Sequence, residues 1–145
     1  MFSEDLKIGK KAEREFAKVL LDRWVSSITF APEWRFKDWD ILAVKDGNEE
    51  SYEVKADFTS TSTGNVWFEY FFNSECSGVY TSKADYIVYQ IDGKFYCVPR
   101  PSLLVWLEFV NKENKIWWDW KLARMFVVPK SDFFTFVSKQ WRVSE

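Results

Sequence analysis

Apolar residues recur at helical spacing near the start of the chain. The spacing predicts an amphipathic helix over roughly 4–25. Glu13 lies midway between two members of the apolar stripe, so it falls inside that stripe. Because a carboxylate that faces a core loses its hydration, Glu13 is expected to need a partner. The members of the stripe are Leu6, Phe16, Ala17, Leu20 and Trp24.

After this helix the pattern changes to short segments with the composition and alternation of strands. Three such segments cover about 27–36, 39–45 and 51–57. The residues between the last two segments, Asp46-Gly47-Asn48, belong to types that favour tight turns. These two segments are therefore predicted to form a β-hairpin.

The middle of the chain continues with strand patterns. Residues 66–72 form a short apolar run that indicates a strand, after a polar stretch rich in Ser, Thr and Gly. Residues 84–91 and 94–98 indicate a second hairpin, because Asp92-Gly93 between them suits a two-residue turn.

Two helices are predicted near the end of the chain. Pro101-Ser102 precedes apolar residues at helical spacing, and Ser131 is placed to cap a last helix rich in phenylalanine. Runs of strands between helices favour an α+β or mixed α/β fold, with a central mixed β-sheet flanked by helices. The apolar residues of the first of these helices are Leu103, Trp106, Leu107 and Val110.

Length and composition predict a single domain over residues 1–145. The chain has 145 residues, of which 47% are hydrophobic and 20% aromatic, which is enough for one core and too little for two ordinary domains. Its first residues are acidic where a secretory signal would be basic, and no apolar stretch is long enough to span a bilayer. A cytoplasmic protein without a membrane partner is therefore expected.

The residue types present exclude several classes of chemistry. The chain has no histidine and two cysteines, so catalytic triads and His-assisted zinc sites are excluded, and Cys76 and Cys97 are expected to stay reduced. Carboxylates, lysine and a metal remain as catalytic groups. The net charge of −2 and the pI near 5.3 provide no overall attraction for phosphate backbones.

Three charged residues on the first predicted hairpin form a candidate site. Glu53 and Lys55 lie two residues apart in the segment 51–57, so their side chains point to the same face. Asp40 is expected on the preceding strand, where cross-strand pairing would bring its carboxylate close to that of Glu53. Two converging carboxylates repel each other unless a cation lies between them, and such oxygen ligands suit Mg²⁺ or Mn²⁺.

Lys55 and Glu13 would complete this site. An ammonium beside a metal-bound water could orient or deprotonate the water and offset the charge that builds up on a phosphate. Because a metal also polarises the phosphate, hydrolysis of a phosphodiester needs no histidine. Glu13 is expected to serve as an additional or water-mediated ligand.

These residues resemble the pattern of the PD-(D/E)XK phosphodiesterases. The matching motifs are Gly9-x-x-x-Glu13, Trp39-Asp40-Ile41-Leu42 and Glu53-Val54-Lys55. The resemblance covers roughly 5–91 and implies a restriction-endonuclease-like core of the order α-β-β-β-α-β. The position before Asp40 is tryptophan instead of proline, and the segment between Lys55 and Ala84 reads as strand and loop where many members have a helix.

The resemblance also implies roles for individual residues. Asp40, Glu53, Lys55 and Glu13 would be the catalytic residues. Asp40, Glu53, Val54 and Glu13 would bind Mg²⁺ or Mn²⁺.

Within this family, the chain looks most like phage-type and Holliday-junction-resolvase-like endonucleases. The segments that carry this resemblance are Thr63-Gly64-Asn65 with Glu69, and Ser77-Gly78 with the residues that follow it. The resemblance implies hydrolysis of DNA, selectivity for branched DNA, an origin in a phage or mobile element, and a two-fold homodimer. Side chains that are equally explained as ordinary polar residues or as contacts to substrate phosphate are Glu69, Ser77, Thr81 and Lys83.

Several alternatives stay open at this stage. A non-catalytic interaction or inhibitor module on the same fold would also explain the acidic pI and the many aromatic residues, and action on RNA is not distinguished from action on DNA. The cluster Trp117, Trp118 and Trp120 is explained by core and interface packing or by stacking on unpaired bases. Candidates for contacts to a nucleic-acid backbone are Arg35, Lys37 and Arg100.

Overall fold

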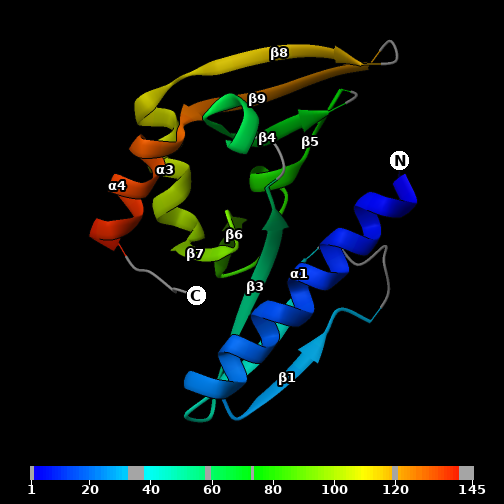
Figure 1. Cartoon of the computed structure of the whole chain (residues 1–145), viewed down its shortest axis with the longest axis vertical. Coiled ribbons are helices and arrows are strands. Elements are labelled where there is room, and N and C mark those ends of the chain that lie inside the picture. The colour runs from blue at the N-terminus through cyan, green and yellow to red at the C-terminus, as the bar shows by residue number, and fades with distance from the viewer. Residues whose placement is uncertain (1, 33–37, 58–59, 73, 119–120, 141–145) are drawn as a thin grey trace.

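A computed structural model of the chain describes residues 2–32, 38–57, 60–72, 74–118 and 121–140 (Figure 1). Helices and strands alternate irregularly along it. Their order is α1 (Phe2–Arg23), β1 (Ser27–Phe30), β2 (Ile41–Lys45), β3 (Asn48–Ala56), α2 (Ser60–Thr63), β4 (Asn65–Phe72), β5 (Glu75–Cys76), the 3₁₀ helix η1 (Gly78–Tyr80), β6 (Tyr86–Ile91), β7 (Lys94–Pro99), α3 (Arg100–Val110), β8 (Glu113–Trp118), β9 (Lys121–Pro129) and α4 (Lys130–Gln140).

The described strands form two sheets. The first sheet has the order β1-β2-β3-β6-β7, in which β3 and β6 are parallel and the other pairs are antiparallel. The second sheet has the order β5-β4-β9-β8 and is antiparallel throughout. In Figure 1 the second sheet lies across the top of the molecule, and α1 crosses β3 of the first sheet below it. The fold is therefore mixed α+β, with a mixed central sheet flanked by helices, as the sequence predicts.

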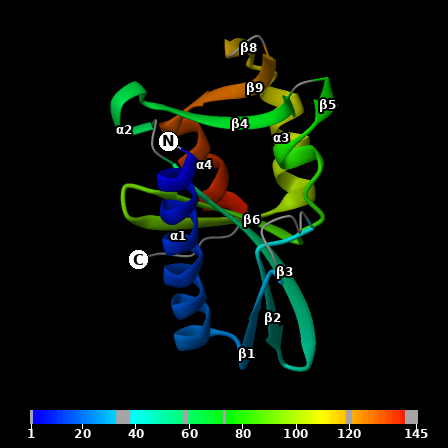
Figure 2. The same cartoon turned by 90° about the vertical axis from the view of Figure 1, so that its right-hand side faces the viewer.

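Strand β3 occupies the middle of the first sheet and is packed on both faces. Tyr52 and Val54 join a buried cluster with Phe16 and Leu20 of α1, and the rings of Phe16 and Tyr52 meet edge to face at 5.4 Å. The alternate residues of β3 point away from α1 because successive side chains of a strand point to opposite faces. Figure 2 shows α1 standing along one side of the first sheet.

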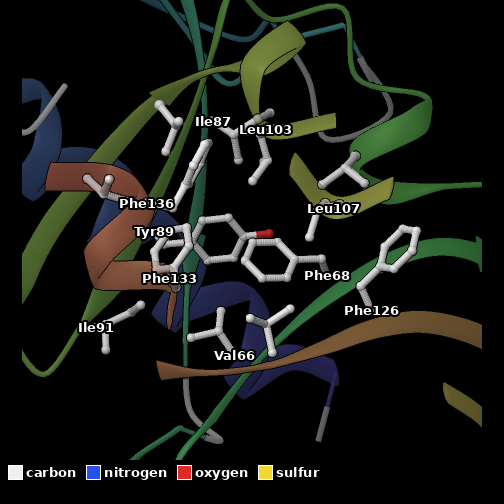
Figure 3. Close-up of a cluster of buried hydrophobic side chains, with 14 of the residues drawn as sticks. Val66, Phe68, Ile87, Tyr89, Ile91, Leu103, Leu107, Phe126, Phe133 and Phe136 are labelled. Carbon is white, nitrogen blue, oxygen red and sulfur yellow. The ribbon is translucent and has the colours of Figure 1, made fainter. Parts of the chain in front are cut away.

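A second core fills the space between the two sheets (Figure 3). Phe68 of β4 packs against Tyr89 of β6 and Phe133 of α4, with ring centroids 4.9 and 5.4 Å away. Leu103 and Leu107 of α3 are fully buried in the same cluster. This core joins α3, α4 and the second sheet to the face of the first sheet that α1 leaves open.

Both predicted hairpins are confirmed. Asp46 and Gly47 have φ values of 51° and 81°, and Asp92 and Gly93 have 52° and 79°, the left-handed pair that a two-residue turn between strands requires. The predicted first helix, the strand at 66–72 and both late helices are also present, with ends shifted by a few residues. Part of the strand predicted over 27–36 lies outside the described residues.

The segment between β3 and β6 reads as strand and loop in the sequence, and the structure confirms this reading. In place of the helix that the resemblance implies, the described residues of this segment form the four-residue α2, β4, β5 and η1, and β4 pairs with β9 from the far end of the chain. The hairpin of β8 and β9 was not expected, and α4 begins at Lys130, so Ser131 lies inside it instead of capping it.

Two further observations concern composition. Cys76 is exposed and Cys97 is buried, and both are free thiols, as expected. Within the described residues, no helix has the length and apolar character that crossing a membrane requires.

The core between the sheets gives the first testable expectation. Replacing Phe68, which is fully buried, by alanine leaves a cavity among several rings and should lower the free energy of unfolding by about 3–5 kcal/mol. Phe109→Ala is the matched control, because Phe109 is 85% exposed, and should change it by less than about 0.5 kcal/mol. Urea denaturation of both variants measures the difference; equal losses would mean that Phe68 is not part of the core.

Candidate functional site

Asp40, Glu53 and Lys55 line one cavity of about 300 Å³. The opposite wall comes from the end of β5 and from η1 with its flanking residues. The sequence therefore predicted correctly that these three side chains converge. The other residues that line the cavity are Cys76, Ser77, Gly78 and Thr81.

Backbone groups of β3 hold Asp40 in place. Its N–H donates to the carbonyl of Tyr52 at 2.9 Å, and its carboxylate oxygen Oδ2 accepts the N–H of Val54 at 2.8 Å. Asp40 lies one residue ahead of β2 rather than within a strand, so the expectation is corrected by one position. Since the N–H and C=O of a strand residue point to the same side, the carbonyl of Val54 also faces the end of β2 where Asp40 lies.

The surroundings of Asp40 disfavour its charged form. Burial raises the pKa of the Asp40 carboxyl and the nearby Glu53 raises it further, while the hydrogen bond from Val54 and the charges of Lys55 and Lys10 lower it. The net result is a raised pKa. A cation beside Asp40 and Glu53 would relieve this repulsion.

Glu53 carries an oxygen that the protein leaves without a hydrogen bond. The residue is only 8% exposed, and its buried Oε2 has no hydrogen-bond partner. Lys55 Nζ lies 3.3 Å from this oxygen, close enough for an ion pair but without hydrogen-bond alignment. Desolvation would lower the pKa of the Lys55 ammonium, but the charges of Glu53 and Asp40 outweigh it and raise that pKa.

Glu13 is buried as predicted, but it lies on α1 and not on the cavity wall. Its carboxylate forms an ion pair with Lys10 at 3.5 Å, which supplies the partner that its position requires. Burial raises the pKa of the Glu13 carboxyl, and the charge of Asp40 adds to that rise. Among the described residues, no three Asp, Glu, Cys or His side chains form a group that could hold a metal.

The wall opposite β3 is held close to β4 by Gly78. Its φ is +53°, and a Cβ at this position would overlap the backbone carbonyl of Glu69. Ser77 Oγ donates to Glu69 Oε2 at 2.8 Å, and Thr81 Oγ1 donates to the carbonyl of Gly78 at 3.3 Å. Ser77 and Thr81, which the sequence explains equally as ordinary polar residues or as substrate contacts, line the same cavity as Asp40.

A second cavity of about 250 Å³ lies on the other side of Lys55. Lys55 and Gly78 line both cavities, so the two form neighbouring parts of one cleft. Glu69 lines the second cavity, and its charge contributes to the raised pKa of Lys55. Glu69 therefore acts on Ser77 and Lys55 and does not line the cavity that holds Asp40 and Glu53.

The remaining candidates lie elsewhere. Lys83 is exposed, contacts Asp38 at 3.9 Å and does not line either cavity. The guanidinium of Arg100 donates to the carbonyls of Val79 and Tyr80, so it holds η1 instead of remaining free for a substrate. Arg35, Lys37 and Trp120 lie outside the described residues. Trp117 is 71% exposed, which is contrary to a role in core packing.

Sequence reasoning missed two contributors to the site. Lys10 is the partner of Glu13, and the spacing of three residues on a helix was the signal that could have identified it. Arg100 supports η1 from α3, and no sequence pattern pointed to this contact because it joins segments about 20 residues apart.

The groups at the end of β2 have the chemistry that a small divalent cation prefers. Asp40 and Glu53 supply two carboxylates, and the Val54 carbonyl faces the same end of the strand. Glu53 Oε2 has no hydrogen bond, and the pKa of Asp40 is raised although Lys55 and Lys10 lie nearby. Hard oxygen ligands with room for water suit Mg²⁺ or Mn²⁺, so these residues fit such an ion.

Comparisons with known proteins give little guidance. No protein-family model matches the chain, and no curated protein matches it. A similar solved structure is that of a bacterial homing endonuclease, which is 18% identical, has a TM-score of 0.48, and matches over 66% of this chain and 65% of its own. The chain thus spans just under two thirds of the length of that protein.

The close approach of Gly78 to β4 gives a second testable expectation. Gly78→Ala should force η1 away from Glu69 and lower the free energy of unfolding by about 1–3 kcal/mol. Gly47→Ala is the control, since Gly47 also has a positive φ but nothing lies within 4 Å of its added Cβ; it should cost about 1 kcal/mol or less. Denaturation curves compare the two, and a smaller loss at Gly78 than at Gly47 would contradict the close contact.

The raised pKa of Asp40 gives a third expectation. The Asp40 carboxyl holds its proton more tightly in the folded protein than in the unfolded chain. The protonated carboxyl therefore contributes to stability below the unfolded-state pKa of Asp40, and this contribution is lost as the pH rises through the folded-state pKa. Asp40→Asn removes the charge but keeps an acceptor for the Val54 N–H. In chelator at neutral pH, this variant should melt a few degrees above the wild type.

Melting curves of the wild type and Asp40→Asn at several pH values check this expectation. Stability of the wild type should fall as the pH rises between the two pKa values of Asp40, and this slope should be weaker in Asp40→Asn. Glu49→Gln, which removes a charge from an exposed side chain of the same hairpin, controls for net charge. An Asp40→Asn protein that melts below the wild type would show that the carboxylate is stabilising in the absence of metal.

Proposed function

We propose that this chain is a divalent-metal-dependent nuclease that hydrolyses DNA phosphodiester bonds. The observation that carries the proposal is the convergence of two carboxylates, Asp40 and Glu53, and one ammonium, Lys55, on a single cavity. Two neighbouring carboxylates, of which Glu53 is buried, have little structural use, since like charges raise the cost of charging. Perturbed ionisation of groups in a cleft is typical of functional sites.

The metal would be held by residues at the end of β2. Asp40 and Glu53 would bind it through their carboxylates and Val54 through its carbonyl, with Glu13 joined through a water molecule. When bound, Mg²⁺ or Mn²⁺ would supply Lewis acidity toward the phosphate and lower the pKa of the attacking water.

Among these side chains, Lys55 would act directly on the attacking water and on the phosphate. Its raised pKa keeps the ammonium protonated, so it serves better as a donor than as a base. It would orient the attacking water and offset the negative charge that develops on the phosphate oxygens. Glu53, 3.3 Å away, holds the ammonium toward the cavity.

The opposite wall would hold the substrate. Ser77 and Thr81 line the cavity that contains Asp40. Their hydroxyl protons go to Glu69 Oε2 and to the carbonyl of Gly78, so each hydroxyl would have to turn from its present acceptor to donate to a phosphate oxygen. Glu69 would repel a phosphate, and its hydrogen bond holds Ser77 at the cavity wall. Lys83, paired with Asp38, would contact DNA only beyond the cavity.

Selectivity for branched DNA and a two-fold homodimer belong to the same proposal, and they are supported by the resemblance of the motifs alone. Symmetric cutting of two strands requires two sites in one assembly. Branched, linear and single-stranded DNA compared side by side test the selectivity. Light scattering of the free protein tests the dimer.

A second candidate function is a non-catalytic interaction module, because α3 exposes apolar side chains. Val105 is 70% exposed and Phe109 is 85% exposed, and both line an open apolar groove with Trp106 and Phe136. Exposed apolar surface of this kind is common at protein interfaces. This function predicts no Mn²⁺ binding that depends on Asp40 and Glu53.

Cleavage and metal binding of a small set of variants test the nuclease proposal. Asp40→Asn and Glu53→Gln should lose both Mn²⁺ binding in calorimetry and Mg²⁺-dependent cleavage. Lys55→Met should still bind Mn²⁺ but cleave at least about 100-fold more slowly, because it lacks only the ammonium. Lys94→Met, an exposed lysine on β7, is the control and should leave both measurements unchanged.

Two results would reject the proposal. Cleavage that persists in Asp40→Asn or Lys55→Met would place the chemistry elsewhere. Absence of both Mn²⁺ binding and cleavage in the wild type, with every DNA form and both metals, would favour the interaction module instead.

A further inference from the structure

Helix α1 carries a row of basic residues along its length. Lys7, Lys11, Arg14 and Lys18 are all exposed, and their spacings of four, three and four residues place them within about 60° of one another around the helix. The row is about 16 Å long at 1.5 Å per residue. The chain as a whole has a net charge of −2, so this concentration of positive charge is local.

The row lies on the side of α1 that faces solvent. Phe16 and Leu20, which lie on the opposite side of the helix, are fully buried against the first sheet. Figure 1 shows α1 across the near side of the molecule with no other element covering it. Because the apolar face of the helix is used in the core, this basic helix has no such face left for insertion into a membrane surface.

The charges of the row are not neutralised within the helix. Over residues 7–23, whose side chains the structure describes, the ion pair that forms is Lys10 with Glu13. Glu15 and Asp22 lie beside the row, and neither comes within ion-pair distance of it. Four like charges in one line repel each other, so a stabilising anion is expected outside the protein.

Lys10 is coupled electrostatically to the candidate site. It lies on the same helix beside Lys7 and Arg14, and its charge lowers the pKa of Asp40. The charge of Lys55 in turn lowers the pKa of Glu13 on α1. These couplings concern Lys10 and Glu13, which lie beside the row and are not members of it.

We propose that this row binds the phosphate backbone of a DNA duplex. A duplex carries about one phosphate for every 1.7 Å of its axis, so a row about 16 Å long laid against it lies near several phosphates. The identity of the ligand rests on the proposed nuclease function. The location of the row explains how a chain with an acidic pI attracts DNA.

Salt-dependent binding of two matched quadruple variants tests the proposal. The row variant is Lys7→Gln, Lys11→Gln, Arg14→Gln and Lys18→Gln, and glutamine keeps the helix propensity. The control removes the same charge from other elements through Lys94→Gln, Lys112→Gln, Lys121→Gln and Lys139→Gln. Fluorescence anisotropy in chelator, with a duplex of about two helical turns, separates binding from cleavage.

The expected result is a change in the salt dependence of the row variant only. If each cation contacts one phosphate, the slope of log K against log salt between about 50 and 200 mM should weaken by about 3 to 4 in the row variant, and Kd should rise at least tenfold. The control should keep the wild-type slope within about 1. Thermal melting should show that both variants remain folded.

Other outcomes overturn the proposal. Equal slopes for the two variants, no duplex binding by the wild type, or row-dependent binding confined to duplex RNA or anionic vesicles would each reject it. Row-dependent DNA binding without any Mg²⁺-dependent cleavage would reject the nuclease proposal and leave this one standing. If the wild type cleaves DNA but the salt slope is unchanged in the row variant, the nuclease proposal stands and the role of the row is rejected.

Discussion

Strand β3 is packed on both of its faces, and this constraint places the rest of the molecule. Tyr52 and Val54 face α1 and contribute to one core, while the intervening residues face the second sheet. A strand has only two faces, so Glu53 and Lys55 point to the face that carries the second sheet. Glu53 is buried there, whereas the side chain of Lys55 is about half exposed. A buried charge is costly unless it is paired, and Lys55 is the charged neighbour of Glu53.

The carboxylates show how incomplete this compensation is. Asp40 is held by the N–H of Val54, and Lys55 lies beside Glu53, yet Glu53 Oε2 has no hydrogen bond and the pKa of Asp40 is raised. Proteins tend to accept such an imbalance where the site has a task, because stability alone would favour its removal. Under the proposed function, a divalent cation would offset this imbalance.

Helix α1 serves two purposes through two faces. Its apolar side covers the first sheet, with Phe16 fully buried, and its outer side carries the basic row. Between these faces, Glu13 and Lys10 form an ion pair. The charge of Asp40 raises the pKa of Glu13, and the charge of Lys55 lowers it. A single helix can therefore stabilise the sheet, adjust the electrostatics of the site and present charge to a ligand, since residues three and four apart share a face.

What the sequence determined by itself was local. Helical spacing identified α1 and placed Glu13 inside its buried stripe, turn residues located both hairpins, and the two-residue period of β3 put Glu53 and Lys55 on one face, because these patterns depend on neighbours a few residues away. Tertiary structure alone decided that β4 pairs with β9 in place of a crossover helix, and that Ser77 and Thr81 form the wall opposite Asp40. It also decided that Arg100 is used to hold η1. These contacts join residues far apart in the chain, and they depend on the packing of whole elements rather than on any periodicity that a single sequence displays.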